Sequence, residues 1–226
     1  MTAKICASIL PKTIDEAAAL IEKAQNQGAN FVEVRLDCLT EHKRLHEITN
    51  SSKLPKIATN RALNNKGGFL GSEKRRKQLL LEAAESGFEY VDLELSVHDL
   101  KKMVGELHGM NVKTIISFHD FNRTPNLSQF GTLFEKETAS GANVCKIVAT
   151  AKSIEDNITA LNFIHKAYRR SNIVCFLMGE LGRPSRILSP LFGGFFTIAS
   201  VEKRKETAAG QMTVQEMKRI YKALEL

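Results

Sequence analysis

The sequence lacks the features of a membrane protein and of a zinc protein. No apolar run approaches the roughly 18 residues of a membrane-spanning helix, and Pro11 interrupts the N-terminal run after about six. The cysteines show no Cys-x-x-Cys spacing, and three of them fall in predicted strands, where they would pack as small hydrophobic side chains. We therefore expect a soluble, cytoplasmic protein without a targeting segment or a metal. The four cysteines are Cys6, Cys38, Cys145 and Cys175.

A nucleic-acid-binding signature is also missing, despite an excess of positive charge. The formal net charge of +7 suits either a polyanionic partner or an acidic substrate. The basic clusters at 74–77, 169–170 and 203–205 are scattered, mostly lie in predicted helices and contain few aromatic residues. We interpret them as solvated helix faces, and expect a small acidic molecule rather than a nucleic acid as the partner.

No linker, low-complexity tract or short repeat divides the chain, so we expect one domain over residues 1–226. β-rich runs alternate with stretches of helical periodicity, which predicts an α/β protein with a parallel (β/α)₈ TIM barrel. An open doubly wound sheet is the alternative, although no Gly-x-Gly-x-x-Gly follows the first strand. The predicted strands are 4–10, 30–37, 56–60, 90–95, 113–119, 144–150, 172–178 and 195–200. The predicted helices are 13–26, 73–86, 97–109, 127–140, 153–169 and 213–225, with Ser72, Ser96 and Ser153 among the capping residues.

Charged residues alternate with apolar ones in the second and fourth predicted strands. Glu33, Arg35 and Asp37 share one face of the second strand, and Asp92 and Glu94 share one face of the fourth. Because the apolar faces must meet the helices, we expect the charged faces to point into the barrel and to pair there. The third strand ends in the same way with Thr59 and Arg61.

A lysine and a histidine stand out within apolar strands. Lys146 is the one charged residue of 144–150, and His119 ends the preceding strand, 27 positions earlier. A dry pocket disfavours the charged amine, so we expect a lowered pKa that makes Lys146 a nucleophile toward carbonyls. A nearby histidine supplies an acid and a base near neutral pH. The pair predicts Schiff-base chemistry; a strand-end lysine reaching toward water is the alternative.

Two segments with glycine follow the last two strands. The stretch 178–186 has two glycines that let the backbone approach a ligand, and it ends in Arg186, whose planar guanidinium suits a carboxylate. Thr207-Ala-Ala-Gly-Gln211 has the small residues of a mobile lid. A surface arginine and an ordinary loop are the alternative interpretations.

The ordered motifs resemble those of type I 3-dehydroquinate dehydratase over nearly the whole chain. They are Glu-Val-Arg-Leu-Asp at 33–37, Ser-Phe-His-Asp-Phe at 117–121 with Thr-Pro at 124–125, Lys146, Met-Gly at 178–179 through Ser-Arg at 185–186, and Ala-Gly-Gln at 209–211. The resemblance implies a barrel that converts 3-dehydroquinate to 3-dehydroshikimate and water, in the shikimate route to aromatic amino acids. It also implies a homodimer that needs neither a metal nor an organic cofactor.

The resemblance further assigns roles to residues. Lys146 would condense with the substrate ketone, and His119 would remove a proton from the neighbouring carbon and protonate the departing hydroxyl. The implied substrate-binding residues are Glu33, Arg35, Arg61, Arg186, Thr207, Gln211 and Ser8. A Schiff-base aldolase and a non-catalytic quinate-type sensor on the same barrel are the alternative functions.

The chain departs from the family pattern in two loops. Relatives commonly have an acidic residue before a Gly-Gly pair, whereas Asn64-Asn65-Lys66 precedes the pair here. An acid that assists His119 is therefore absent or comes from elsewhere, with Glu94 and Asp120 as candidates. The lid also lacks the usual proline, so we expect it to be more flexible when open.

Overall fold

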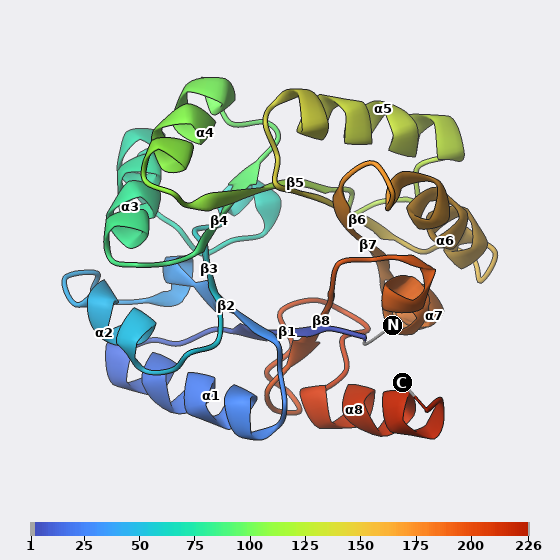
Figure 1. The fold of residues 1–226 in the computed structure, drawn as a ribbon, viewed down its shortest axis with the longest axis horizontal. Coiled ribbons are helices and arrows are strands. Elements are labelled where there is room, and N and C mark those ends of the chain that lie inside the picture. The colour runs from blue at the N-terminus through green and yellow to red at the C-terminus, as the bar shows by residue number, and fades with distance from the viewer. Residues whose placement is uncertain (1–2, 226) are drawn as a thin grey trace.

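The chain forms a barrel of parallel strands surrounded by helices (Figure 1). The structure is a computed structural model, and it describes residues 3–225. The strands are β1 (Ile5–Ile9), β2 (Phe31–Arg35), β3 (Lys56–Thr59), β4 (Tyr90–Glu94), β5 (Lys113–His119), β6 (Val144–Thr150), β7 (Asn172–Met178) and β8 (Thr197–Ser200). Neighbours pair in parallel in the order β7-β6-β5-β4-β3-β2-β1-β8. The Phe195 N–H donates to the Ile173 carbonyl at 2.7 Å, so β7 and β8 nearly close the barrel.

The predicted barrel is confirmed, and the open sheet is excluded. The helices are α1 (Ile14–Asn26), α2 (Leu45–Asn50), α3 (Glu73–Glu85), α4 (Leu100–Gly109), α5 (Leu127–Ala139), α6 (Asp156–Ala167), α7 (Arg183–Leu188) and α8 (Val214–Ala223). We did not predict α2 and α7, because six residues are too few to show helical periodicity. Within residues 3–225, no helix has the length and apolar character to cross a membrane.

Of three predicted serine caps, one is confirmed. The Ser72 hydroxyl accepts a hydrogen bond from the Arg75 N–H at the start of α3. The predictions for Ser96 and Ser153 are wrong, because α4 and α6 begin later, at Leu100 and Asp156. Before α6, the Asp156 carboxylate accepts from the N–H groups of residues 152 and 153, so the donors there are satisfied without a serine cap.

The barrel has an apolar layer between the strands and the helices and a second one inside, near the starts of the strands. Polar side chains are left at the other end of the interior. Val32, Val34, Val91 and Leu93 face outward and pack against the helices, as their alternation predicts. Inside, Phe31 packs edge-on against Tyr90 and also against Phe196, with ring centroids 5.9 and 5.2 Å apart. This aromatic plug fills the part of the barrel near the strand starts, so the charged residues gather toward the carboxyl ends.

Candidate active site

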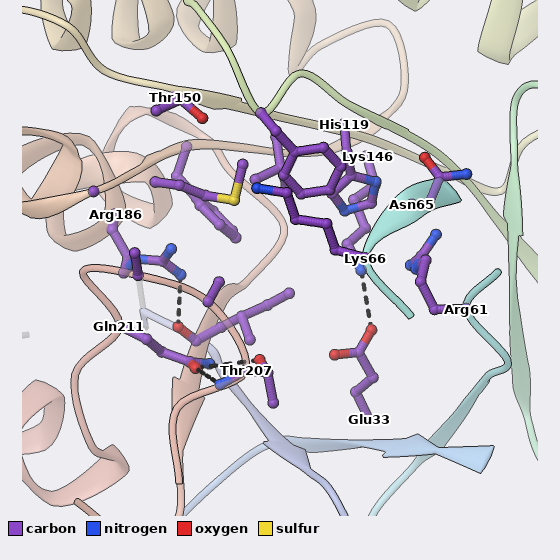
Figure 2. Close-up of a pocket in the computed structure, with 18 of the residues that line it drawn as sticks. Glu33, Arg61, Asn65, Lys66, His119, Lys146, Thr150, Arg186, Thr207 and Gln211 are labelled. Atoms are coloured by element: carbon purple, nitrogen blue, oxygen red, sulfur yellow. Dashed lines mark hydrogen bonds and ion pairs between the residues drawn. The ribbon is translucent and has the colours of Figure 1, made fainter. Parts of the chain in front are cut away.

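A cavity of about 260 Å³ lies at the carboxyl ends of the strands (Figure 2). Its wall combines charged side chains from the strands with residues of the loops that follow β3 and β8. Eight of the nine site residues named from the sequence line it: Glu33, Arg35, Arg61, His119, Lys146, Arg186, Thr207 and Gln211. The cavity is therefore where the barrel brings these distant sequence positions together.

Ser8 is the one candidate that does not line this cavity. It is buried, and its hydroxyl donates to Glu33 Oε2 at 2.6 Å. Thr59 Oγ1 donates to the other oxygen of Glu33 at 3.0 Å. Ser8 and Thr59 therefore hold the Glu33 carboxylate in place, and the ligand contact expected for Ser8 stays a prediction.

Lys146 is held by two carboxylates inside the barrel. Its Nζ lies 3.0 Å from Glu33 Oε1 and 2.8 Å from Asp92 Oδ2. The other oxygen of Asp92 accepts from Arg61 Nη2 at 3.0 Å and from the Ser117 hydroxyl at 2.7 Å. All these side chains are buried, so two cations and two anions balance each other in a region that excludes water.

The expected lowering of the Lys146 pKa is wrong for the free protein. Burial does favour the neutral amine, but Asp92 and Glu33 together outweigh it, so the pKa of Lys146 is raised above its usual value. The sequence could not show that two carboxylates converge on one amine from other strands. Lys146 is therefore an ammonium at rest and becomes a nucleophile only after it loses a proton.

His119 has the opposite electrostatic environment. Burial lowers its pKa well below the usual range, and the positive charges of Arg61 and Lys146 act in the same direction. The imidazole is consequently neutral at pH 7 and is able to accept a proton. Its ring stacks on Phe121, with centroids 5.9 Å apart and planes inclined by 12°.

Arg186 is a buried cation without a counter-ion among residues 3–225. Its side chain is 1% exposed and lies over the Phe176 ring, with the guanidinium carbon 4.3 Å from the centroid. Nη1 donates to the Ile198 carbonyl at 3.1 Å, whereas Nε and Nη2 have no hydrogen-bond partner in that part of the chain. Burial lowers the pKa of Arg186 to about 9, so it stays charged at neutral pH. The arrangement suits an anionic ligand.

The segment from Thr207 to Gln211 lies against the cavity as a lid. The N–H and the hydroxyl of Thr207 donate to Gln211 Oε1 at 2.6 and 3.2 Å. The Gly179 N–H donates to the Ala209 carbonyl at 3.0 Å. Gly210 has φ of +76°, and a Cβ there would lie 2.1 Å from the Gly179 carbonyl oxygen, so only glycine permits this close approach.

Asp37 does not continue the inward-facing row of β2, contrary to the predicted alternation. The strand ends at Arg35, and residues 36–38 form a short 3₁₀ helix that turns the side chain. Its carboxylate binds the Arg35 guanidinium at 2.6 and 2.8 Å and accepts from the N–H groups of Arg61 and Gly68. Asp37 thus ties the end of β2 to the loop after β3.

Neither proposed helper acid lines the cavity that contains His119. Glu94 forms an ion pair with Arg76 at 2.7 Å and a longer one with Arg61 at 3.5 Å. Asp120 accepts from two backbone N–H groups of its own turn, at residues 122 and 123. Arg76 is also only 3% exposed, so its interpretation as part of a solvated helix face is wrong.

Asn65, Lys66 and Phe121 line the cavity, although the sequence did not identify them as site residues. Lys66 Nζ lies 4.3 Å from the centroid of the Phe121 ring. The departure from the family pattern at 64–66 was a signal that this loop is unusual. Its position at the cavity, however, depends on contacts with Asp37 that only the fold reveals.

Replacing Asp92 by Asn should make Lys146 more reactive in the free protein. A charged hydrogen bond contributes about 1.5 to 3 kcal/mol, equivalent to about 1 to 2 pKa units. We expect acetylation of Lys146 at neutral pH, measured by peptide mass spectrometry, to become about 10- to 100-fold faster. Exposed Lys166 is the internal control and should be labelled at an unchanged rate. An unchanged rate at Lys146 would show that Asp92 does not keep it protonated.

Comparison with known proteins identifies the family. The family model for type I 3-dehydroquinase matches residues 5–226. A 3-dehydroquinate dehydratase of Dehalococcoides mccartyi is 38% identical over 200 residues, 88% of each chain, and one of Methanosarcina barkeri is 33% identical over 97% of this chain and 95% of the relative. The crystal structure of 3-dehydroquinate dehydratase from Geobacillus kaustophilus has the same fold, with a TM-score of 0.92 and 21% sequence identity. The match covers 100% of this chain and 92% of that one. The chain belongs to the type I 3-dehydroquinase family.

Proposed function

We propose that Lys146 forms an imine with the ketone of 3-dehydroquinate and that His119 transfers the protons of the elimination. Family membership establishes the overall reaction, dehydration of 3-dehydroquinate to 3-dehydroshikimate in the shikimate pathway. The observation that supports these roles is a buried lysine and a neutral histidine on the wall of one cavity. They supply a carbonyl nucleophile and a base within the same enclosed space.

The resting charges suggest the order of the first steps. Lys146 loses a proton to a base, for which neutral His119 is suited, and its amine then adds to the ketone carbon. The ketone oxygen leaves as water with one proton from the lysine nitrogen and the proton that His119 returns, so a protonated imine and a neutral His119 remain. Glu33, whose pKa Lys146 lowers to about 2 despite burial, and Asp92 stay ionised, so they stabilise this cation as they stabilise the ammonium.

The imine then makes elimination possible with a modest base. His119 takes the proton from the carbon next to the imine, whose C=N group accepts the electron pair. The electrons return to form the carbon–carbon double bond as the hydroxyl group leaves, and protonated His119 supplies the proton that converts it to water. Hydrolysis of the imine releases the product and restores Lys146.

Arg186 is proposed to bind the substrate carboxylate, with the remaining residues ordering the hydroxyl groups. A carboxylate would provide the counter-ion that the buried guanidinium lacks within residues 3–225. Thr207 and Gln211 would contact the substrate from the lid. Glu33, Arg35 and Arg61 are the proposed partners of its hydroxyl groups.

The chemistry is tested with Lys146→Ala and His119→Ala. With 3-dehydroquinate and borohydride, wild-type protein should gain a stable adduct on Lys146, and without borohydride it should form the conjugated enone product. Lys146→Ala should lose both signals. His119→Ala should still form some adduct, but more slowly because the proposed base for Lys146 is missing, while enone formation falls about 10²- to 10⁴-fold, the usual contribution of an acid–base group. Lys166→Ala serves as the surface control.

Each other outcome points to a defined alternative. Normal enone formation by Lys146→Ala would overturn the imine proposal. An adduct that leads to carbon–carbon cleavage would favour the aldolase, and the absence of both signals in wild-type protein would favour the sensor. Full activity of His119→Ala would assign the proton transfers to another group.

Arg186→Met should affect stability and binding in opposite directions. The free protein should become more stable, with a higher Tm, because a buried charge without a counter-ion is removed while the methylene packing on Phe176 is retained. KM should rise about 30-fold or more, since losing one partner of a buried charge pair costs about 2 to 5 kcal/mol. Exposed Arg183→Met, in the same helix, is the control for both measurements. An unchanged KM would remove Arg186 from the substrate site.

We further propose that residues 1–226 act as one catalytic domain and assemble as a cytoplasmic homodimer. The family match over residues 5–226 supports the single domain, and resemblance to the family supports the dimer. Sedimentation equilibrium should give about twice the 25.2 kDa chain mass. A mass equal to one chain at micromolar concentration would contradict the dimer.

A further inference from the structure

His119 has a ring nitrogen that is not satisfied in the structure. Its Nδ1 is buried and makes no hydrogen bond with any residue of 3–225. In a neutral imidazole, one nitrogen carries the proton and the other accepts, and the partner of the first decides which is which. A histidine that takes a proton through Nε2 therefore needs an acceptor at Nδ1.

The carboxylates around His119 are already engaged. Glu33 and Asp92 bind Lys146, and Asp92 also binds Arg61. Glu94 pairs with Arg76 on the outer side of this network. Asp120 accepts hydrogen bonds from two backbone N–H groups of its own turn. Among the described residues that line the cavity, Glu33 is the only carboxylate, and it binds Lys146, so we look for the acceptor of Nδ1 among the uncharged groups of the wall.

Asn65 is an uncharged polar side chain with an available acceptor. It lines the same cavity as His119, and Figure 2 shows it on the side of the cavity where His119 and Arg61 lie. Its amide nitrogen makes only a long hydrogen bond, 3.4 Å, to Asn64. Its Oδ1 accepts none from the described part of the chain, so this oxygen is available to another donor.

The loop that carries Asn65 is attached both to the barrel and to the histidine. The Gly68 N–H donates to Asp37 at 2.8 Å, and a Cβ at Gly67 would lie 1.9 Å from the Arg61 carbonyl oxygen. Lys66 contacts the face of Phe121, whose ring is parallel to that of His119. These contacts attach the loop of Asn65 to the barrel and to the Phe121 ring beside the imidazole.

We propose that Asn65 is the positioning residue of His119, with its Oδ1 accepting a hydrogen bond from Nδ1 after a rotation of the amide. Nε2 is then the unprotonated nitrogen that acts as the base. This inference rests on the proposed role of His119. A neutral amide orients the ring without adding the negative charge that would favour its protonated form. The charged groups that influence His119 are Arg61, Lys146, Asp92 and Glu33, and Lys66 lies against the Phe121 ring that stacks on His119.

A charge introduced at Asn65 should be sensed by His119. We expect Asn65→Asp to raise the pKa of His119, measured by NMR titration of the free protein, by about 1 unit or more, as an opposite charge within about 4 to 6 Å does. Asn64→Asp carries the same charge on the exposed neighbouring residue and should leave this pKa nearly unchanged. Equal shifts in the two variants would overturn the proposal. Because no substrate is present, the result is independent of whether the proposed reaction occurs.

The orientation of the ring is tested with Asn65→Ala. In the wild-type protein, ¹⁵N chemical shifts of His119 should show a protonated Nδ1, and in the variant the proton should move in part to Nε2. We expect kcat to fall about tenfold or more while KM and Tm change little. Loss of activity with an unchanged tautomer would overturn the proposal, and so would an unchanged tautomer with full activity. Asn64→Ala is the matched control.

Discussion

The pairing of Lys146 with two buried carboxylates is the interaction on which the rest of the site depends. A charge moved from water into a protein interior loses several kcal/mol of solvation unless it is compensated. Glu33 and Asp92 compensate Lys146, and Asp92 simultaneously compensates Arg61. Side chains from β2, β4 and β6, together with Arg61 two residues after the end of β3, are therefore joined by charge inside the barrel. The same carboxylates that make burial of the lysine possible also keep it protonated at rest.

Because Lys146 is protonated at rest, Lys146 and His119 have different chemical roles. The positive charges of Lys146 and Arg61 help to keep His119 neutral, so the site contains an ammonium and an unprotonated imidazole at the same time. An acid and a base with separated pKa values are what imine formation followed by proton abstraction requires. The ion pairs are consequently part of the catalytic arrangement as well as of the barrel interior.

Arg186 differs from these residues because its buried positive charge has no carboxylate partner among residues 3–225. Arg35, Arg61, Arg76 and Lys146 each have a carboxylate partner, whereas Arg186 has a carbonyl and an aromatic ring. Arg186 lines the cavity, and its Nε and Nη2 have no hydrogen-bond partner among the described residues. The protein therefore keeps an unfavourable charge in its free form, which a carboxylate ligand would relieve on binding. Arg35 differs from Arg186 in this respect, since Asp37 binds it and leaves it a positioned but already neutralised cation.

Much of the architecture followed from local pattern. The alternation of Val32, Glu33, Val34 and Arg35 and the spacing of the eight apolar runs determined the strands and the faces they present, because a two-residue period leaves no other way to bury the valines. The ordered motifs likewise identified the family, and eight of nine named site residues line one cavity. What the tertiary structure alone decided are the partners: that Ser8 supports Glu33, that Arg76 is buried against Glu94, that Asp37 anchors the loop of Asn65, and that Lys146 is protonated. These depend on distances between strands far apart in sequence, and burial and such distances set the shift of a pKa from the ordinary value of the residue.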